Sequence, residues 1–477
     1  MSISASLNNA LSGMTAASRM AEVVSSNLSN ALTDGYGRRT IEYSSGALGG
    51  AGEGTILRHV DRGILGDRRL ADARLGGFDT MVTTMGRIEG VLGQAGVPGS
   101  ITDRIVAVES ALIDAAGDPS SPIRLSSLGA TLQGLTEGLN TASREVQTLR
   151  QEADASIAGQ VDQLNTALRQ VEQLNGDITL ARNSGIDPSG LMDQRQTVID
   201  TIATLVPVRE LDRDGGQVAL LSPGGELLLD GKAKQFGFVP NGTITADMTL
   251  ASGALSGLTL DGAPLAADGI GHLAGGTLGA TFQTRDQALV DAQASLDTIA
   301  ADLVTRFQDP AVDPTLAVGQ PGLLTDAGGA FDATAVTGLA GRIAVNAAVD
   351  PARGGQITNL RDGVNAVTPG PSGAAGLLQA LSGALSDPRA IAGDPAPQSA
   401  SGRAASLSAS VGNQRLTYES ELSFATARWS SLKEAEAAGG VDSDHEMQML
   451  LRVEQAYAAN ARVIQAVDMM MQHLLEL

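Results

Sequence analysis

The sequence predicts a mainly α-helical, multidomain chain with a β domain inserted between its helices. Apolar residues recur at spacings of three and four over long segments, as they do along one face of a helix. Aromatic residues make up only 3% of the 477 residues, so Ala, Leu, Val and Ile must fill the core, which suits closely packed helices. Residues 208–275 instead combine strand-like runs with turn residues, including Ser222-Pro223-Gly224-Gly225 between two such runs.

A first helix is predicted over residues 3–32. Its remaining surface is Ser, Asn, Thr and Ala with almost no charge, which is unusual for a solvated helix. It is either an amphipathic helix packed on its own domain or a helix surrounded by other helices in an assembly. A turn follows at residues 33–37, and the glycine-rich residues 40–65 predict an irregular loop. The apolar stripe of this helix consists of Leu7, Leu11, Met14, Ala17, Ala21, Val24 and Leu28.

The middle of the chain predicts an elongated helical domain. Its strongest segment, residues 141–181, corresponds to a rod about 60 Å long at 1.5 Å per residue. Such rods usually belong to elongated bundles. A second helix is expected over residues 191–205, and Trp429 lies on the apolar stripe of a later one, which indicates core packing. We assign to this domain residues 66–207, 279–308 and 373–438.

Two further segments lie between these helices. Residues 208–275 form the predicted β insertion, in which residues 243–250 continue the strand-like pattern. Residues 309–370 are rich in Gly, Pro, Asp and Ala and contain one short strand-like run, residues 343–345. We describe 309–370 as irregular and β-like and assign it to no domain.

A last helix follows Gly439-Gly440 and continues to Leu477. Ser443 and Glu446 have the spacing of a capping box at its start. Asn460 is the polar exception in its heptad pattern, and a buried Asn typically costs stability while fixing register. One heptad position holds Leu450, Tyr457, Ile464 and Met471, and the other holds Val453, Asn460, Val467 and Leu474.

We therefore expect residues 1–40 and 440–477 to pair as a coiled coil and to form a polymerisation domain. Heptad periodicity is the pattern of helices that bury one stripe against each other. The expected assembly interface comprises Leu7, Leu11, Met14, Ala21, Leu28, Leu450, Val453, Tyr457, Asn460, Ile464, Val467, Met471 and Leu474.

Composition argues against several classes of function. The net charge of −21 opposes binding to nucleic acid or to anionic membranes. The absence of cysteine excludes disulfides, thiol catalysis and cysteine metal sites. The acidic run 442–446 resembles a metal cluster, but acidic residues also belong in the first turn of a helix. With scattered histidines and no nucleophile elbow or phosphate loop, we expect no enzyme, no metal and no cofactor.

The N-terminal segment also lacks the features of a secretory signal peptide. It has neither a basic region nor an apolar core, and no run in the chain approaches 18 apolar residues. If the protein leaves the cell, we expect it to do so with its N-terminus intact and without membrane insertion.

Both ends of the chain resemble the signatures of flagellar rod, hook and hook-associated proteins. Residues 24–31 (VSSNLSNA), followed by 33–36 (TDGY), resemble the N-terminal signature, although Asn is usual at the position of Leu32 and Pro at that of Asp34. Residues 454–464 (EQAYAANARVI) resemble the C-terminal signature. The motif residues at the N-terminal end are Asn27, Asn30, Gly35 and Tyr36.

Two internal segments are similar to the hook-associated protein 1 family in particular. Leu191-Met192-Asp193-Gln194-Arg195 resembles its Leu-Asp-Gln-Arg motif and follows the long helix, as expected there. Asp193, Gln194 and Arg195 are the matching residues. Residues 275–279 before Arg285-Asp286 resemble a second segment of that family.

The resemblance implies a structural role at the junction between flagellar hook and filament, outside the cell. It implies export through the flagellar type III apparatus without a cleaved signal peptide, and assembly into a ring of identical subunits. The implied partners are the flagellar hook protein, a second junction protein of the FlgL type and an export chaperone. The terminal helices would form the inner tube, with the middle domains outside.

Two alternatives remain open at this point. A flagellar hook protein, or another axial protein, shares the terminal signatures, but hook proteins are mainly β between their terminal helices. The long helix and residues 193–195 therefore favour the junction subunit. A secreted, adhesin-like binding module is the second alternative, and it predicts ligand binding by the isolated segment 208–275.

Overall fold

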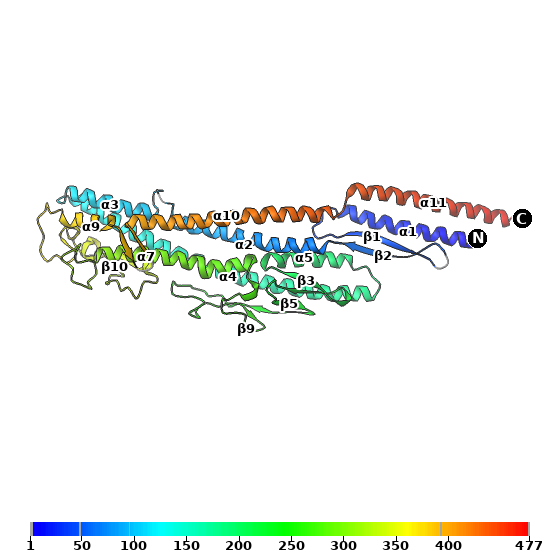
Figure 1. Cartoon of the computed structure of the whole chain (residues 1–477), viewed down its shortest axis with the longest axis horizontal. Coiled ribbons are helices and arrows are strands. Elements are labelled where there is room, and N and C mark those ends of the chain that lie inside the picture. The colour runs from blue at the N-terminus through cyan, green and yellow to red at the C-terminus, as the bar shows by residue number, and fades with distance from the viewer. Residues whose placement is uncertain (1–2, 47–48, 95, 392–393, 476–477) are drawn as a thin grey trace.

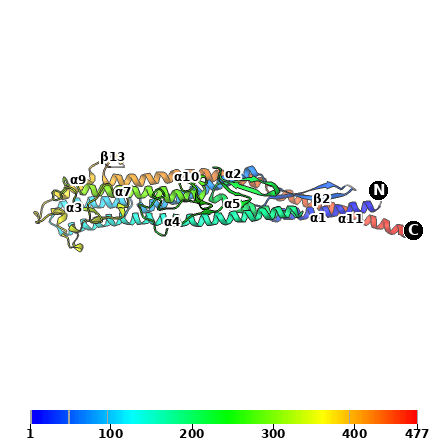
Figure 2. The same ribbon diagram turned by 90° about the horizontal axis from the view of Figure 1, so that it is seen from below.

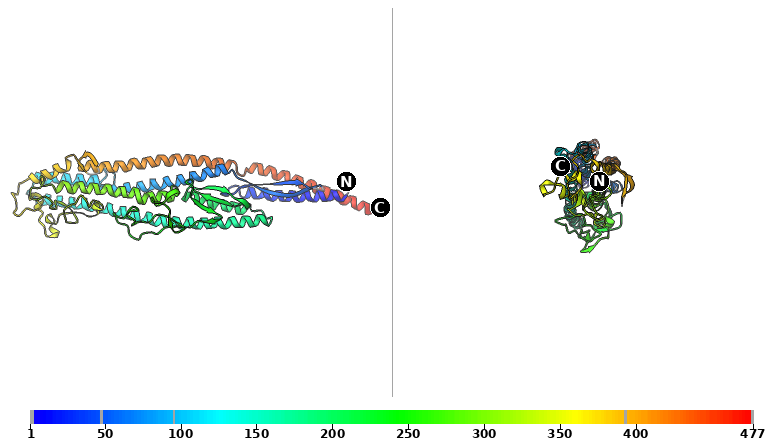
Figure 3. Two further views of the ribbon diagram at one scale, coloured as in Figure 1. Left: turned by 60° about the horizontal axis from the view of Figure 1, so that its bottom comes forward. Right: turned by 90° about the vertical axis from the view of Figure 1, so that its left-hand side faces the viewer.

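The chain forms a long, narrow rod with both of its ends near one tip (Figure 1). The computed structural model describes residues 3–46, 49–94, 96–391 and 394–475. A view along the long axis shows how small the cross-section is (Figure 3). The prediction of a mainly helical chain with an inserted β region and long paired terminal helices is confirmed.

Long helices run along the rod and make up most of it. The π-helical turn Thr284–Ala288 joins α6 to α7. The helices are α1 (Ile3–Ser29), α2 (Arg62–Leu92), α3 (Ile101–Gly117), α4 (Pro122–Asn183), α5 (Ser189–Leu205), α6 (Gly276–Gln283), α7 (Leu289–Phe307), α8 (Asn359–Asp362), α9 (Gly376–Ser386), α10 (Ala400–Ala438) and α11 (Ser443–Leu475).

The strands form small antiparallel sheets. The inserted β region holds a four-stranded sheet, β3 to β6, and a three-stranded sheet, β7 to β9, and the remaining strands form hairpins. The strands are β1 (Arg38–Ser45), β2 (Ala51–His59), β3 (Arg209–Asp212), β4 (Val218–Leu221), β5 (Leu227–Asp230), β6 (Lys232–Ala233), β7 (Phe236–Gly237), β8 (Thr259–Leu260), β9 (Ala263–Pro264), β10 (Leu324–Asp326), β11 (Ile343–Val345), β12 (Arg389–Ile391) and β13 (Asp394–Gln398).

Three local predictions were wrong. Residues 40–65 are not a loop, because β1 and β2 pair as a hairpin and α2 begins at Arg62. Residues 243–250 form turns rather than a strand. Helix α4 begins at Pro122, well before residue 141, because the Ser121 hydroxyl caps it and proline suits its first turn.

Two hydrophobic clusters hold the rod together. The first joins α2, α3, α4, α7, α9 and α10, and it includes residues of the β10–β11 hairpin, so part of 309–370 packs onto the helices. The second joins α4 and α5 to the inserted β sheets and α6. The 62-residue α4 contributes to both clusters and is therefore the element that aligns them. Within the described ranges, no helix combines the length and apolarity needed to cross a bilayer.

The elements nearest the two chain ends form a distinct part of the rod, which we call the terminal arm: α1, β1, β2 and α11. The remaining elements are called the body. Figure 2 shows α1 and α11 side by side beyond the end of the body. The hairpin packs on α1, where the Tyr43 hydroxyl donates a hydrogen bond to the carbonyl of Ala16 at 2.9 Å.

Candidate assembly site: the terminal arm and its joint with the body

Small side chains line the face of α1 that is buried in the arm. Ala10, Ala17 and Val24 are buried and lie seven residues apart, which is the spacing of a heptad seam. On α11, Val453 and Val467 are buried with exposures of 5% and 4%. The buried part of the pairing is therefore narrow, and it is built from Ala and Val.

The larger apolar residues of the expected interface lie mostly outside this narrow seam. Leu7, Met14, Ala21, Leu450 and Ile464 are half-buried. Four others are exposed, to 56% for Leu11, 37% for Leu28, 45% for Tyr457 and 47% for Met471. The side chain of Leu474 lies outside the described part of the chain. The heptad position that includes Val453 and Val467 is thus the more buried one, whereas the other leaves Tyr457 and Met471 exposed.

Asn460 lies against α1 at Gly13. Its side chain faces Gly13, where an added Cβ would lie 2.7 Å from Nδ2. The amide also donates to the carbonyl of Ala456, one turn earlier in α11. Glycine at position 13 is what lets α1 approach this polar residue of the seam.

The start of α11 differs from the predicted capping box. Asp442, not Ser443, caps the helix, because its carboxylate accepts from the backbone N–H groups of Asp444 and His445. Glu446 is buried, and its carboxylate pairs with Arg38 of β1 at 2.9 Å. The acidic run at this helix start therefore serves as a cap and as a tie between α11 and the hairpin.

The N-terminal motif residues gather where α1 ends and the hairpin begins. Asn27 is fully buried, and its amide donates to the carbonyl of Arg39 at 2.8 Å. Its amide oxygen accepts from the Tyr36 hydroxyl and from the N–H of Arg39, both at 2.9 Å. Asn30 donates to the carbonyl of Ser26 at the end of the helix. These contacts fold the chain back from α1 into β1.

The internal motif meets the N-terminal motif at this turn. Asp193 of α5 accepts three hydrogen bonds from the arm: from Gly37 N at 3.0 Å, from Arg58 Nε at 2.7 Å and from Arg39 Nη2 at 2.6 Å. We call Asp193 and its three partners, Gly37, Arg39 and Arg58, the clasp. Gly35, at a φ of +79°, lies against α5, where a Cβ would be 2.6 Å from Thr197 Oγ1. Glycine is required there both for its conformation and for the close approach.

The other two residues of the internal motif point elsewhere. Gln194 is exposed. Arg195 is buried and donates through Nη1 to Asn175 Oδ1 at 2.8 Å and to the carbonyl of Gly216 at 2.7 Å. Burial lowers the pKa of Arg195 to about 10, so it remains charged at neutral pH. Asp193 thus faces the arm, while Arg195 ties α5 to α4 and to the loop before β4.

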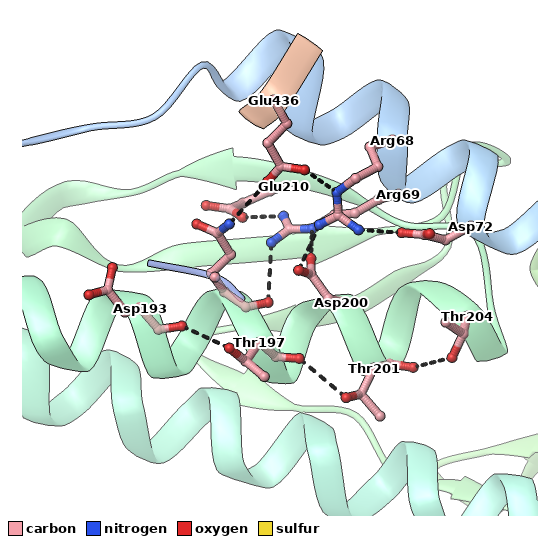
Figure 4. A network of polar contacts seen from close by, with 12 residues as sticks. Arg68, Arg69, Asp72, Asp193, Thr197, Asp200, Thr201, Thr204, Glu210 and Glu436 are labelled. Atoms are coloured by element: carbon pink, nitrogen blue, oxygen red, sulfur yellow. Dashed lines mark hydrogen bonds and ion pairs between the residues drawn. The ribbon is translucent and has the colours of Figure 1, made fainter. Parts of the chain in front are cut away.

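Beside the clasp lies a cluster of charged residues contributed by α2, α5, β3 and α10 (Figure 4). Arg68 contacts the carboxylates of Asp72, Asp200 and Glu436, each at 2.6 Å. Arg69 contacts Asp200 and Glu210, each at 2.7 Å. We call these six residues the ion-pair cluster. It joins the root of α2 to the end of α10, next to the point where the arm leaves the body.

Burial changes the titration of this cluster. It raises the pKa values of Asp72 and Glu436, and Arg68 offsets only part of that effect. Burial by itself lowers the pKa of Arg68, but the carboxylates of Asp200, Glu436 and Asp72 outweigh it and raise that pKa. The cluster contains two guanidinium groups and four carboxylates, so the positive charges are outnumbered by the negative ones.

Trp429 belongs to this region rather than to the core. It is half-buried, its indole N–H donates to Asp72, and the Lys433 ammonium lies 5.1 Å from the centre of its ring. The prediction of a purely core role for Trp429 was therefore wrong, because its polar N–H required a partner.

Sequence reasoning missed the basic residues of the joint. Arg38, Arg39 and Arg58 lie on the hairpin, which was predicted to be a loop. The cross-strand pairing that brings Arg39 and Arg58 to Asp193 was therefore not visible, and neither was the contact of Arg38 with Glu446. Arg68 and Asp72 carried a usable signal, because charges four residues apart lie on one face of a helix. Their partners on α5 and α10 are distant in the sequence and only the fold brings them together.

Three family models match the chain. The model described as the FlgK helical domain matches residues 85–312, the model of flagella basal body rod proteins matches 7–36, and that of the rod protein C-terminus matches 437–477. The two terminal matches fall on α1 and α11, and the internal one includes α4 and α5.

Individual relatives agree with these models. Flagellar hook-associated protein 1 of Salmonella typhimurium is 25% identical over 263 residues, which is 52% of this chain and 47% of the relative. The protein of the same name from Bacillus subtilis is 23% identical over 256 residues, covering 50% of each chain. The chain spans about half the length of the relatives it matches.

One solved structure is also similar, that of the flagellar hook junction protein FlgK from Burkholderia pseudomallei. It is 21% identical with a TM-score of 0.46, over 55% of this chain and 46% of that one. The assignment rests on the sequence matches, which place a FlgK helical domain between the two terminal segments of flagellar rod proteins. These matches identify residues 85–312 as a FlgK helical domain and the two ends of the chain as segments of the flagellar rod-protein type.

Proposed function

We propose that this chain is a structural subunit of the bacterial flagellum that connects the hook to the filament. Its subunits would assemble with one another through the terminal arm into a ring. The mechanism is burial of apolar surface between helices, without a chemical reaction. The family match supports this role, since flagellar hook-associated proteins are structural components.

The observation that carries the proposal is the unfilled apolar stripe of the arm. Large apolar side chains stay exposed along the length of α11: 58% for Leu451, 45% for Tyr457 and 60% for Met469, with the exposed Met470 and Met471 following Met469 in sequence. A helix face that stays in water normally carries polar groups, so several exposed large apolar side chains on one helix point to an interaction surface. The stripe fits the helices of neighbouring subunits, which would bury it in the assembled tube.

The proposed role also implies which proteins the terminal arm contacts. We infer that the arm packs with other copies of this chain and, at the two faces of the ring, with the flagellar hook protein and a second junction protein of the FlgL type. An export chaperone would cover the apolar stripe of α11 before secretion. The site of action is the extracellular hook–filament region.

A deletion strain tests the proposal. Cells lacking this chain should retain hooks, carry no attached filaments and release flagellin into the medium. The full chain supplied in trans should restore filaments, whereas a chain truncated after Val441 should not, because α11 and its stripe are gone. A deletion strain that still carries filaments would contradict the proposed function.

A further inference from the structure

The arm and the body are joined by polar contacts rather than by a shared hydrophobic core. Among the described residues, neither hydrophobic cluster contains a residue of the arm. The chain passes between arm and body twice: through the short connection from His59 to Arg62 and through Gly439-Gly440 between α10 and α11. Two short connections without a common core allow the arm to change its direction unless something else holds it.

The contacts that hold the arm converge on one helix of the body. Within the described ranges, the hydrogen bonds and ion pairs between arm and body end on α5. Asp193 receives three of them, from Gly37, Arg39 and Arg58. Gln196 accepts one more from Arg58 at 2.5 Å. All three partners of Asp193 lie on or beside the hairpin, so this carboxylate makes three of the four hydrogen bonds described here between the hairpin region and α5.

The clasp is shielded and geometrically specific. The side chains of Asp193, Arg39 and Arg58 are exposed by only 15%, 17% and 11%. Arg58 reaches Asp193 by passing over Gly37, where an added Cβ would lie 2.5 Å from Arg58 Nε. Charge-assisted hydrogen bonds in such a partly buried setting are stronger than exposed ion pairs. The Gly35-Tyr36-Gly37 turn thus serves to bring the hairpin close to α5.

We propose that Asp193 is a positioning residue that sets the direction of the terminal arm relative to the body. The inference deepens the proposed function and rests on it, because helices that pack into a common tube must leave every body in the same direction. Without the clasp, the arm would still fold around Asn27 but would sample a range of directions about Gly439-Gly440.

The absence of cysteine allows a direct measurement on the full-length monomer. Ser25→Cys on α1 and Gln173→Cys on α4 replace exposed residues of arm and body and take spin labels at these two positions only. Pulsed electron paramagnetic resonance then gives the distribution of distances between arm and body. We expect one narrow distribution in the otherwise unaltered chain.

Asp193→Ala should broaden this distribution, because losing one charge-assisted hydrogen bond shifts an equilibrium by about tenfold or more. Asp193→Asn, which keeps an acceptor oxygen but no charge, should broaden it less. Arg58→Ala should act like Asp193→Ala, and combining the two should add little. Asp162→Ala, at an exposed aspartate of α4, is the matched control and should change nothing.

Three results would overturn the inference. The first is an unchanged distance distribution in Asp193→Ala, and the second is a distribution that is already broad in the unaltered chain. The third is loss of the helical body itself in Asp193→Ala, seen as a common unfolding of arm and body in thermal melts, which would make Asp193 a residue of body stability. Each result leaves the deletion-strain test of the proposed function unaffected, because that test reads filament attachment alone.

Discussion

Arg68 is the residue whose loss should affect the root of the arm most strongly. Its guanidinium contacts three carboxylates at 2.6 Å, and its side chain is only 11% exposed. Replacing one member of a buried ion pair leaves uncompensated charge and costs about 3–5 kcal/mol. Because Asp200 and Glu436 retain 24% and 28% exposure, we expect Arg68→Ala to cost about 3 kcal/mol, the lower end of that range.

The effect should also depend on pH in a defined direction. Burial raises the pKa values of Asp72 and Glu436, and a raised carboxyl pKa means that stability is lost as pH rises through the folded-state pKa. Without Arg68 this loss grows. The deficit of Arg68→Ala should therefore be larger at pH 7 than at pH 5, where the two carboxyl groups are nearer to protonation.

Urea unfolding followed by tryptophan fluorescence measures this deficit. Trp429 is the single tryptophan of the chain and donates to Asp72, so its emission reports on the ion-pair cluster itself. Arg428→Ala removes an exposed arginine whose ion pair with Asp67 spans 3.9 Å, and as the control it should cost less than about 1 kcal/mol. Equal deficits for the two variants at pH 7, or an Arg68→Ala deficit independent of pH, would refute the reasoning.

Three further substitutions test the arm. Asn27→Ala leaves its buried hydrogen-bonding partners unpaired, so it should cost about 1–3 kcal/mol and speed hydrogen exchange in β1; unchanged exchange would contradict the turn we describe. Gly35→Ala, at positive φ against Thr197, should lower the stability of the arm in thermal melts by about 1–3 kcal/mol, and an unaltered melt would show that α5 shifts to accommodate the added methyl group. Asn460→Leu should strengthen helix association but broaden the oligomer distribution in analytical ultracentrifugation; an unchanged distribution would mean that Asn460 does not fix register.

Periodicity allowed much of the fold to be predicted. The stripes of α1, α5 and α11 and the β4–β5 hairpin follow from local patterns that need no distant partner. The terminal motifs and Asp193 could be named from resemblance before their mutual contact was known. What the pattern could not provide is that Asp193 and the Gly35–Gly37 turn face one another, since 156 residues separate Gly37 from Asp193.

Two of the wrong predictions have identifiable physical causes. The β1–β2 hairpin was missed because Gly49 and Gly50, at positive φ, belong to a turn that looks like a flexible loop in the sequence. The apparent capping box at Ser443 failed because Glu446 is used in a tertiary ion pair with Arg38 instead. In the second case a contact made across the fold, and not the local sequence pattern, determined the role of the residue.

The measurement that most directly tests the central claim is the location of this chain on the flagellum. Val318 lies in the body and is 93% exposed, so Val318→Cys offers a labelling site in a protein without other cysteines. Motile cells carrying this variant, labelled with a maleimide dye and with a second dye on the filament, should show one focus at the hook end of each filament. Label along the whole filament, or none outside the cell, would contradict a junction subunit.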